Sequence, residues 1–306
     1  MLLMQQSESR MVRIVEVGPR DGLQGLSSQV PATVRAKLIE KLVDAGLTHI
    51  EVGSFVSPKK VPAMANSDQV VKQIKRKPGV VYSALTPNIK GFEQALAVGV
   101  SEVAVFSSAS EHFCQENINC SIAESFRRFE PIMTAATKHN IPVRGYISCV
   151  MGCPYEGDIS SKKVVEVCRE MKQAGCYELS LGDTIGVGTP KKARELFNAV
   201  VGVVPIGCIS AHFHNTYGQA LANLYGMVVD GLSVIDSATA GLGGCPYAPG
   251  ASGNISTEDV VYMLNGLGIE TGIDMQQLLA ASDYICKYIG IASKSNTGQA
   301  LAAKKQ

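Results

Sequence analysis

The chain has 306 residues, 46% of them hydrophobic, which is enough to bury one large core in a single domain. Its 28 Lys and Arg residues nearly balance its 27 Asp and Glu residues, so its surface has no strong field that would attract nucleic acid or an anionic membrane. We therefore expect a globular protein that binds a small molecule and no nucleic acid.

Eight short apolar runs recur along the chain, and each is followed by a segment of helical pattern. The runs lie at residues 12–17, 49–53, 80–84, 102–106, 143–148, 177–181, 208–213 and 233–236. Between them, segments such as 32–46 and 160–175 place apolar residues three and four positions apart, which is the period of a helix packed by one face. The chain thus predicts eight strands that alternate with helices.

Glycines suited to end a helix stand shortly before four of these strands, at Gly46, Gly99, Gly175 and Gly231. Strands that are separated by helices must be parallel, because a parallel neighbour needs a crossover connection, and a parallel sheet needs both faces covered. Eight such units predict one (β/α)8 barrel, the TIM barrel, over residues 1–306.

A doubly wound open sheet is the competing architecture. Its Gly-rich dinucleotide-binding turn is missing here, since the turn after the first strand reads GPRDGLQ, residues 18–24. After Asp259 the pattern predicts the last barrel helix and one or two additional helices. We expect a short N-terminal extension and a loose polar tail from Ser293.

The cysteines and the N-terminal residues bear on the cellular compartment of the protein. Nine cysteines, an odd number without paired spacing, indicate reduced thiols, and Cys149 and Cys153 are expected to be packing residues rather than zinc ligands. The first residues show no leader pattern, and no apolar run is long enough to span a bilayer. A cytoplasmic protein without a membrane segment is the expectation.

Polar residues gather at the predicted strand ends, where the reactive groups of such a barrel are found. They are Arg20 and Asp21 after the first strand, Glu51 in the second, Asp183 after the sixth, and His212 and His214 at the end of the seventh.

His212 and His214 are separated by one residue, so on a strand both imidazoles face the same side. Two histidines on one face of an apolar strand are costly unless something binds them, although a hydrogen-bonded core pair is the alternative. With Asp21 as an anionic partner they predict a site for Mg²⁺, Mn²⁺, Zn²⁺ or another first-row ion. For Asp21 itself, a turn or helix-capping role is the alternative.

Glu51 stands in an apolar strand, where an unpaired carboxylate would be expensive. Arg20 is the expected partner, because strands one and two are neighbours and a guanidinium can bridge a carboxylate and a substrate oxygen. The pair either serves catalysis or is a plain ion pair that holds the barrel together.

Residues 239–254, TAGLGGCPYAPGASGN, hold five glycines and two prolines and follow the last predicted strand. This composition predicts an active-site loop, better explained as a mobile lid than as a phosphate-binding loop, because no Lys-Ser/Thr pair accompanies the glycines. Cys245 within it is either a proton donor or an inert thiol.

Six segments together resemble the hydroxymethylglutaryl-CoA lyase family, in order and over residues 11–290. They read VGPRDGLQ, IEVGSFVSP, SASEHFCQENINCS, ELSLGDTIGVGTP, AHFHNTYGQALAN and AGLGGCPYAPGASGNISTEDVVYML. The glycine-rich loop is the most specific of them.

The resemblance implies a divalent-metal-dependent carbon–carbon lyase that cleaves 3-hydroxy-3-methylglutaryl-CoA to acetyl-CoA and acetoacetate, with Mg²⁺ or Mn²⁺ as cofactor. It implies a metal site made of Asp21, His212, His214 and Asn254. Arg20 and Gln24 would bind substrate; Arg20, His212, Glu51, Asp183 and Cys245 would act in catalysis.

Other functions remain open at this stage. His212, or Asp21 or Glu51 through water, could be the general base. A condensing synthase, a pyruvate-releasing aldolase and a catalytically silent barrel are the alternatives, although such synthases usually carry a further C-terminal domain. We expect a homo-oligomer, a dimer, that binds an acyl-CoA.

Overall fold

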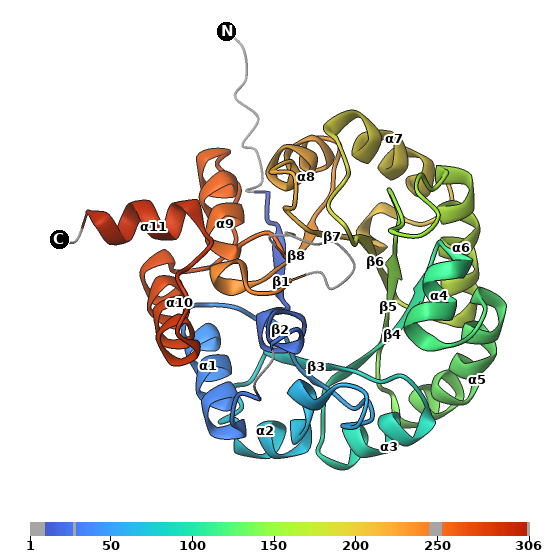
Figure 1. Cartoon of the computed structure of the whole chain (residues 1–306), viewed down its shortest axis with the longest axis horizontal. Helices are drawn as coiled ribbons and strands as arrows, with labels where there is room; N and C mark the ends of the chain where they lie inside the picture. The colour runs from blue at the N-terminus through green and yellow to red at the C-terminus, as the bar shows by residue number, and fades with distance from the viewer. Residues whose placement is uncertain (1–9, 27–28, 245–252, 305–306) are drawn as a thin grey trace, which may run out of the picture.

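A computed structural model describes residues 10–26, 29–244 and 253–304, and these form a closed barrel of eight parallel strands (Figure 1). The strands are β1 (Arg13–Glu16), β2 (His49–Ser54), β3 (Val81–Leu85), β4 (Glu102–Ser108), β5 (Val143–Ser148), β6 (Glu178–Asp183), β7 (Ile209–Phe213) and β8 (Val234–Ser237). They pair in chain order, and β8 closes on β1. The predicted (β/α)8 barrel is confirmed, each strand lies within two residues of its prediction, and an open sheet is excluded.

Helices occupy the connections and surround the strands in Figure 1. They are α1 (Ala32–Asp44), α2 (Ser67–Gln73), α3 (Ile89–Ala97), α4 (Glu111–Ile118), α5 (Ile122–His139), α6 (Ser161–Ala174), α7 (Pro190–Val201), α8 (Ala220–Val229), α9 (Thr257–Gly266), α10 (Met275–Ile289) and α11 (Asn296–Ala303). Ser160, for example, caps α6 by accepting from Lys163 N, and Gly175 ends it at φ +110°. The other three predicted helix-end glycines also have positive φ.

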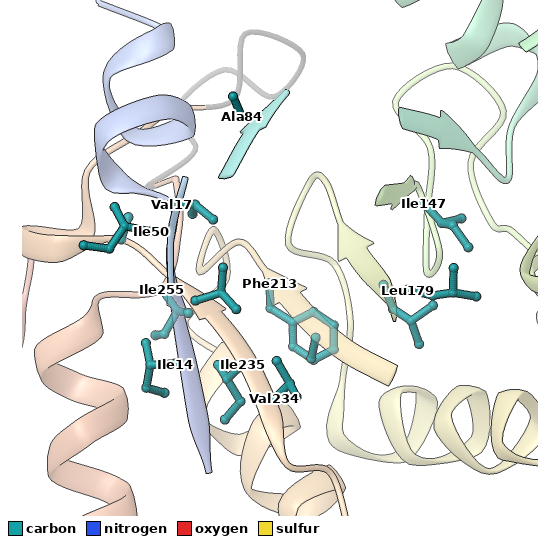
Figure 2. Close-up of a cluster of buried hydrophobic side chains, with 14 of the residues drawn as sticks. Ile14, Val17, Ile50, Ala84, Ile147, Leu179, Phe213, Val234, Ile235 and Ile255 are labelled. Atoms are coloured by element: carbon teal, nitrogen blue, oxygen red, sulfur yellow. The ribbon is translucent and has the colours of Figure 1, made fainter. Parts of the chain in front are cut away.

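The hydrophobic core lies between the strands and the surrounding helices. Side chains alternate along each strand, and Ile50, Phe213 and Ile235 are among the fully or almost fully buried residues of this cluster (Figure 2). The barrel interior is different, because it holds charged side chains: Arg144 of β5 reaches across to Asp236 of β8, with Nη2 and Oδ1 2.6 Å apart. The barrel is therefore filled in part by ion pairs rather than by apolar side chains alone.

The C-terminal segment corrects one expectation. From Ser293 onward the chain was expected to be loose, but α11 packs on α9. Ser295 is fully buried, and its Oγ donates to Asp259 Oδ1 over 2.9 Å. The predicted additional helices after the barrel are present as α10 and α11. Among the described residues, no helix has the length and apolar character needed to cross a membrane.

The eight cysteines in the described part of the chain are all free thiols, as the sequence predicted. Cys149 and Cys153 are buried packing residues at the end of β5 and in the following loop. The Cys153 sulfur lies 3.0 Å from Ser110 Oγ.

Candidate active site and metal centre

Arg20 and Asp21 stand on a single helical turn, η1 (Gly18–Gly22), that directly follows β1. The Arg20 side chain is buried; its Nε donates to Glu51 Oε2 and its Nη1 to Asp21 Oδ1, each over 2.6 Å. Burial alone would lower the Arg20 pKa, but the negative charges of Glu51 and Asp21 outweigh it and raise the pKa above its usual value. Arg20 is therefore a permanent cation, and its predicted pairing with Glu51 is confirmed.

Asp21, His212 and His214 meet at the carboxyl end of the barrel. Each offers one ligand atom such that the three atoms lie within 4.8 Å of one another. His212 Nε2 is 3.8 Å from Asp21 Oδ2, and the two imidazole centroids are 5.7 Å apart. The sequence-based prediction that both histidines face one point beside Asp21 is confirmed.

The protonation states of these residues suit a cation. Burial lowers the His214 pKa to about 4, so this imidazole is neutral near pH 7. Burial would raise the pKa of Asp21, but Arg20 and the two histidines outweigh it and hold the pKa below its usual value. His214 Nδ1 is buried without a hydrogen-bond partner, whereas His212 turns Nε2 toward Asp21 and Nδ1 toward Asp236. One carboxylate oxygen and two imidazole nitrogens within 4.8 Å of one another fit a divalent metal ion.

Asn254, the last residue of the glycine-rich segment, also lies beside Asp21. Its Nδ2 donates to Asp21 Oδ2 over 2.7 Å and to the Leu242 carbonyl over 3.2 Å, and its backbone pairs with that of His214. Gly243, at φ +119°, allows this approach, because a Cβ there would lie 2.8 Å from Asn254 Nδ2. The structure thus brings the fourth predicted metal residue beside Asp21.

Glu51 is fully buried, and only one of its two carboxyl oxygens accepts hydrogen bonds. Oε2 accepts from Arg20 and, over 3.2 Å, from the Tyr146 hydroxyl, whereas Oε1 has no partner. Burial raises the Glu51 pKa, and Arg20 offsets part of that shift. The register with β3 skips Val52, which is an extra residue in β2 just after Glu51. Bulges of this kind are common beside active sites because they redirect side chains.

Three residues that contact the site were not predicted from the sequence: Tyr146, Arg144 and Asp236. Tyr146 lies under Arg20, with the guanidinium carbon 5.4 Å from the ring centroid. Asp236 Oδ2 lies 3.4 Å from His212 Nδ1, and Asp236 is itself held by both terminal nitrogens of Arg144. A carboxylate behind a metal histidine fixes the orientation of the ring. A charged residue within an apolar strand, the signal that identified Glu51, was also present at Arg144 and Asp236.

Of the three remaining predicted site residues, the structure describes Asp183 and Gln24. Asp183 is fully buried, but its carboxylate accepts from the backbone of Val187 and of Gly188, over 3.2 and 2.8 Å. Burial raises its pKa to about 6. These contacts shape the loop after β6, so its catalytic role stays a prediction. Gln24 is half-buried just after η1, and Cys245 with the loop centre lies outside the described residues.

A cluster of potential metal ligands at the mouth of a (β/α)8 barrel, next to a buried Arg–Glu pair, is typical of an enzyme active site. The HMGL-like family model matches residues 11–285, and the chain belongs to this family. The resemblance seen in the sequence is thereby confirmed.

Individual relatives agree over almost the whole chain. The 3-hydroxy-3-isohexenylglutaryl-CoA/hydroxymethylglutaryl-CoA lyase of Pseudomonas aeruginosa is 56% identical over 96% of this chain and 98% of its own. The mitochondrial hydroxymethylglutaryl-CoA lyase of Rattus norvegicus is 55% identical over 95% of this chain and 90% of its own. A crystal structure of the P. aeruginosa hydroxymethylglutaryl-CoA lyase superimposes with a TM-score of 0.95 at 55% identity, covering 97% of this chain and 99% of that one.

Proposed function

We propose that this protein is a carbon–carbon lyase that cleaves 3-hydroxy-3-methylglutaryl-CoA to acetyl-CoA and acetoacetate. The observation that carries the proposal is the cluster of Asp21, His212 and His214 beside Arg20 and Glu51, in a chain about 55% identical to lyases named for this substrate.

The reaction breaks the C2–C3 bond of the substrate. It needs a base for the proton of the C3 hydroxyl, a positive group for the charge that moves to the thioester oxygen, and an acid that protonates C2. Arg20 is the permanent cation at the site, and we assign it to the thioester oxygen. Water is restricted there, since Arg20 is only 6% exposed and Glu51 is fully buried, and electrostatic stabilisation is stronger in such a setting.

The proposed metal ligands are Asp21, His212, His214 and Asn254, with Mg²⁺ or Mn²⁺ as the ion. When bound, such an ion binds substrate oxygens and lowers the pKa of the alcohol.

Among the chain's own groups, His212 is the proposed base or relay, since Asp236 can support its charge from 3.4 Å. Glu51, whose Oε1 has no partner, is the alternative. Cys245 is the proposed acid that protonates C2.

Purified protein incubated with 3-hydroxy-3-methylglutaryl-CoA and Mn²⁺ or Mg²⁺ should release acetyl-CoA and acetoacetate, identified by mass. A sample treated with EDTA and the His214→Ala variant are the controls, and both should be nearly inactive. Intact substrate after prolonged incubation with either metal would refute the proposal.

The same assay separates the alternatives. A condensing synthase would consume acetyl-CoA in the reverse direction, a pyruvate-releasing aldolase would act on hydroxy acids without CoA, and a silent barrel would bind Mn²⁺ without turnover. Because one relative is named for two substrates, a thioester with a longer C3 branch is a useful competitor. We also propose a cytoplasmic dimer, which light scattering and cell fractionation would test.

A further inference from the structure

Glu16, the last residue of β1, has a fully buried carboxyl group on the helix-facing side of the barrel, and this burial raises its pKa to about 8. One of its oxygens, Oε1, accepts from two backbone amides, Gly18 N and Thr239 N, each over 2.8 Å. The other, Oε2, accepts from Thr257 Oγ1 over 2.6 Å. Within the described residues Glu16 forms no ion pair, so hydrogen bonds alone satisfy it.

The three donors belong to the segments that carry the site. Gly18 begins the η1 turn, which holds Arg20 and Asp21. Thr239 begins η4 (Thr239–Gly241), which leads into the glycine-rich segment, and Thr257 begins α9 just after Asn254. A single carboxylate therefore joins the Arg20–Asp21 turn to both ends of the glycine-rich segment.

The fit around Glu16 is tight. A Cβ on Gly18 would lie 2.5 Å from Glu16 Oε1 and 3.2 Å from Thr239 Cγ2, so only glycine permits this approach. A second buried glutamate, Glu258, holds the residue that follows Thr239: its Oε1 accepts from Ala240 N over 2.9 Å. Ala240 has the left-handed φ of +58°, which costs energy for an alanine and persists only where its surroundings enforce it.

We infer that Glu16 is a positioning residue for the metal centre: it fixes Asp21 and Arg20 relative to Asn254 by holding three backbone segments on one carboxylate. Other contacts hold these side chains individually: Arg20 bonds to Asp21 and Glu51, and Asn254 bonds to Asp21 and Leu242. Glu16 instead joins the backbone segments that carry them. The activity arm of the test rests on the proposed function, whereas the metal arm does not.

The test compares Glu16→Met, which keeps the volume and removes the acceptors, with Glu16→Gln, which can still accept from both amides and bond to Thr257. Supporting partners of metal ligands change metal affinity or activity by about 10–100-fold when lost. We expect Glu16→Met to raise the Mn²⁺ dissociation constant by about tenfold and to lower kcat by a similar factor, with KM little changed. Glu16→Gln should restore both to within about threefold.

Ile14→Ala is the matched control, because Ile14 lies two residues earlier on the same strand face and is also buried (Figure 2). It should lower the melting temperature without changing Mn²⁺ affinity or kcat. If Glu16→Met does not fold, Thr257→Val removes one of the three bonds and should weaken Mn²⁺ binding by about threefold.

Two results would overturn the inference: Mn²⁺ affinity and kcat of Glu16→Met equal to those of the wild type, or the same losses in Ile14→Ala. A wild-type protein that binds Mn²⁺ but does not cleave the thioester would refute the proposed function alone. In that case the Mn²⁺ titrations would still test whether Glu16 positions the metal-binding residues.

Discussion

Two groups of charged side chains lie inside this barrel, and both are buried except for Asp21, whose side chain is 22% exposed. In the inner group, Arg144 donates to Glu178, Asp236 and Ser210, and Asp236 also accepts from Ser180 and Ser210, all over 2.6 to 2.9 Å. In the group at the mouth, Glu51 Oε1 and His214 Nδ1 have no hydrogen-bond partner. Burial does not distinguish the two groups, but the completeness of their hydrogen bonds does.

This difference in hydrogen bonding indicates which group supports the fold and which group is suited to bind a ligand. A buried ion pair with every bond made is a rigid scaffold, whereas buried polar atoms without partners are costly unless a ligand completes them. The two groups are connected where Asp236 Oδ2 lies 3.4 Å from His212 Nδ1. We therefore expect the inner group to hold the mouth in place and the mouth to bind a ligand.

Arg20→Gln should have the largest effect, because it removes the cation proposed to stabilise the thioester oxygen. We expect kcat to fall by about 10³-fold or more, without weaker Mn²⁺ binding, since Asp21, His212 and His214 remain. Steady-state kinetics and Mn²⁺ titration would check this. Unchanged turnover would remove Arg20 from the mechanism.

Asp236→Asn tests the inner group. It leaves the buried Arg144 with less compensating charge, and breaking a buried pair costs about 3–5 kcal/mol of stability. Thermal unfolding should show a melting temperature lower by roughly 10 °C, far more than for Ser210→Ala, which removes one hydroxyl from the same group. Equal melting temperatures for Asp236→Asn and the wild type would contradict a supporting role.

His214→Ala tests the mouth by removing one of the predicted ligands. Calorimetric titration should show Mn²⁺ affinity reduced by about 100-fold. His112 of α4, whose side chain is 54% exposed, supplies the control, and His112→Ala should bind Mn²⁺ like the wild type. Equal affinities in the two variants would argue against the shared histidine face.

A pH titration gives the smallest expected effect. The folded pKa of His214 is about 4, against an ordinary value of 6.5, because of burial. Between these values the unfolded chain binds the proton and the folded one does not, so stability falls as pH decreases from 6.5 to 4. Without metal, the wild type should lose about 1–3 kcal/mol more than His214→Gln over this range in denaturant unfolding. Parallel curves would contradict the shift.

The strand pattern and the histidine pair were predictable because both depend on local periodicity. The eight apolar runs predicted the barrel, and the two-residue period of a strand predicted that His212 and His214 lie on one face. The Arg20–Glu51 pair followed from the cost of a lone carboxylate in an apolar strand. The same cost applied to Arg144 and Asp236, but their strands are not neighbours, so no sequence pattern joined them.

Other features depended on tertiary contacts that sequence does not reveal. Asp183 has the expected place at a strand end, but its carboxylate bonds to the amides of its own loop. The polar residues after Ser293 gave no sign that Ser295 would be buried against Asp259. Glu16 stood near the end of an apolar run, and its donors come from residues more than 200 positions away as well as from Gly18.

The central claim is that the incomplete group at the barrel mouth holds a divalent cation. Anomalous diffraction from crystals grown with Mn²⁺ tests it most directly. We expect one strong peak within bonding distance of Asp21, His212 and His214. A peak elsewhere, with these three side chains unliganded, would contradict the account.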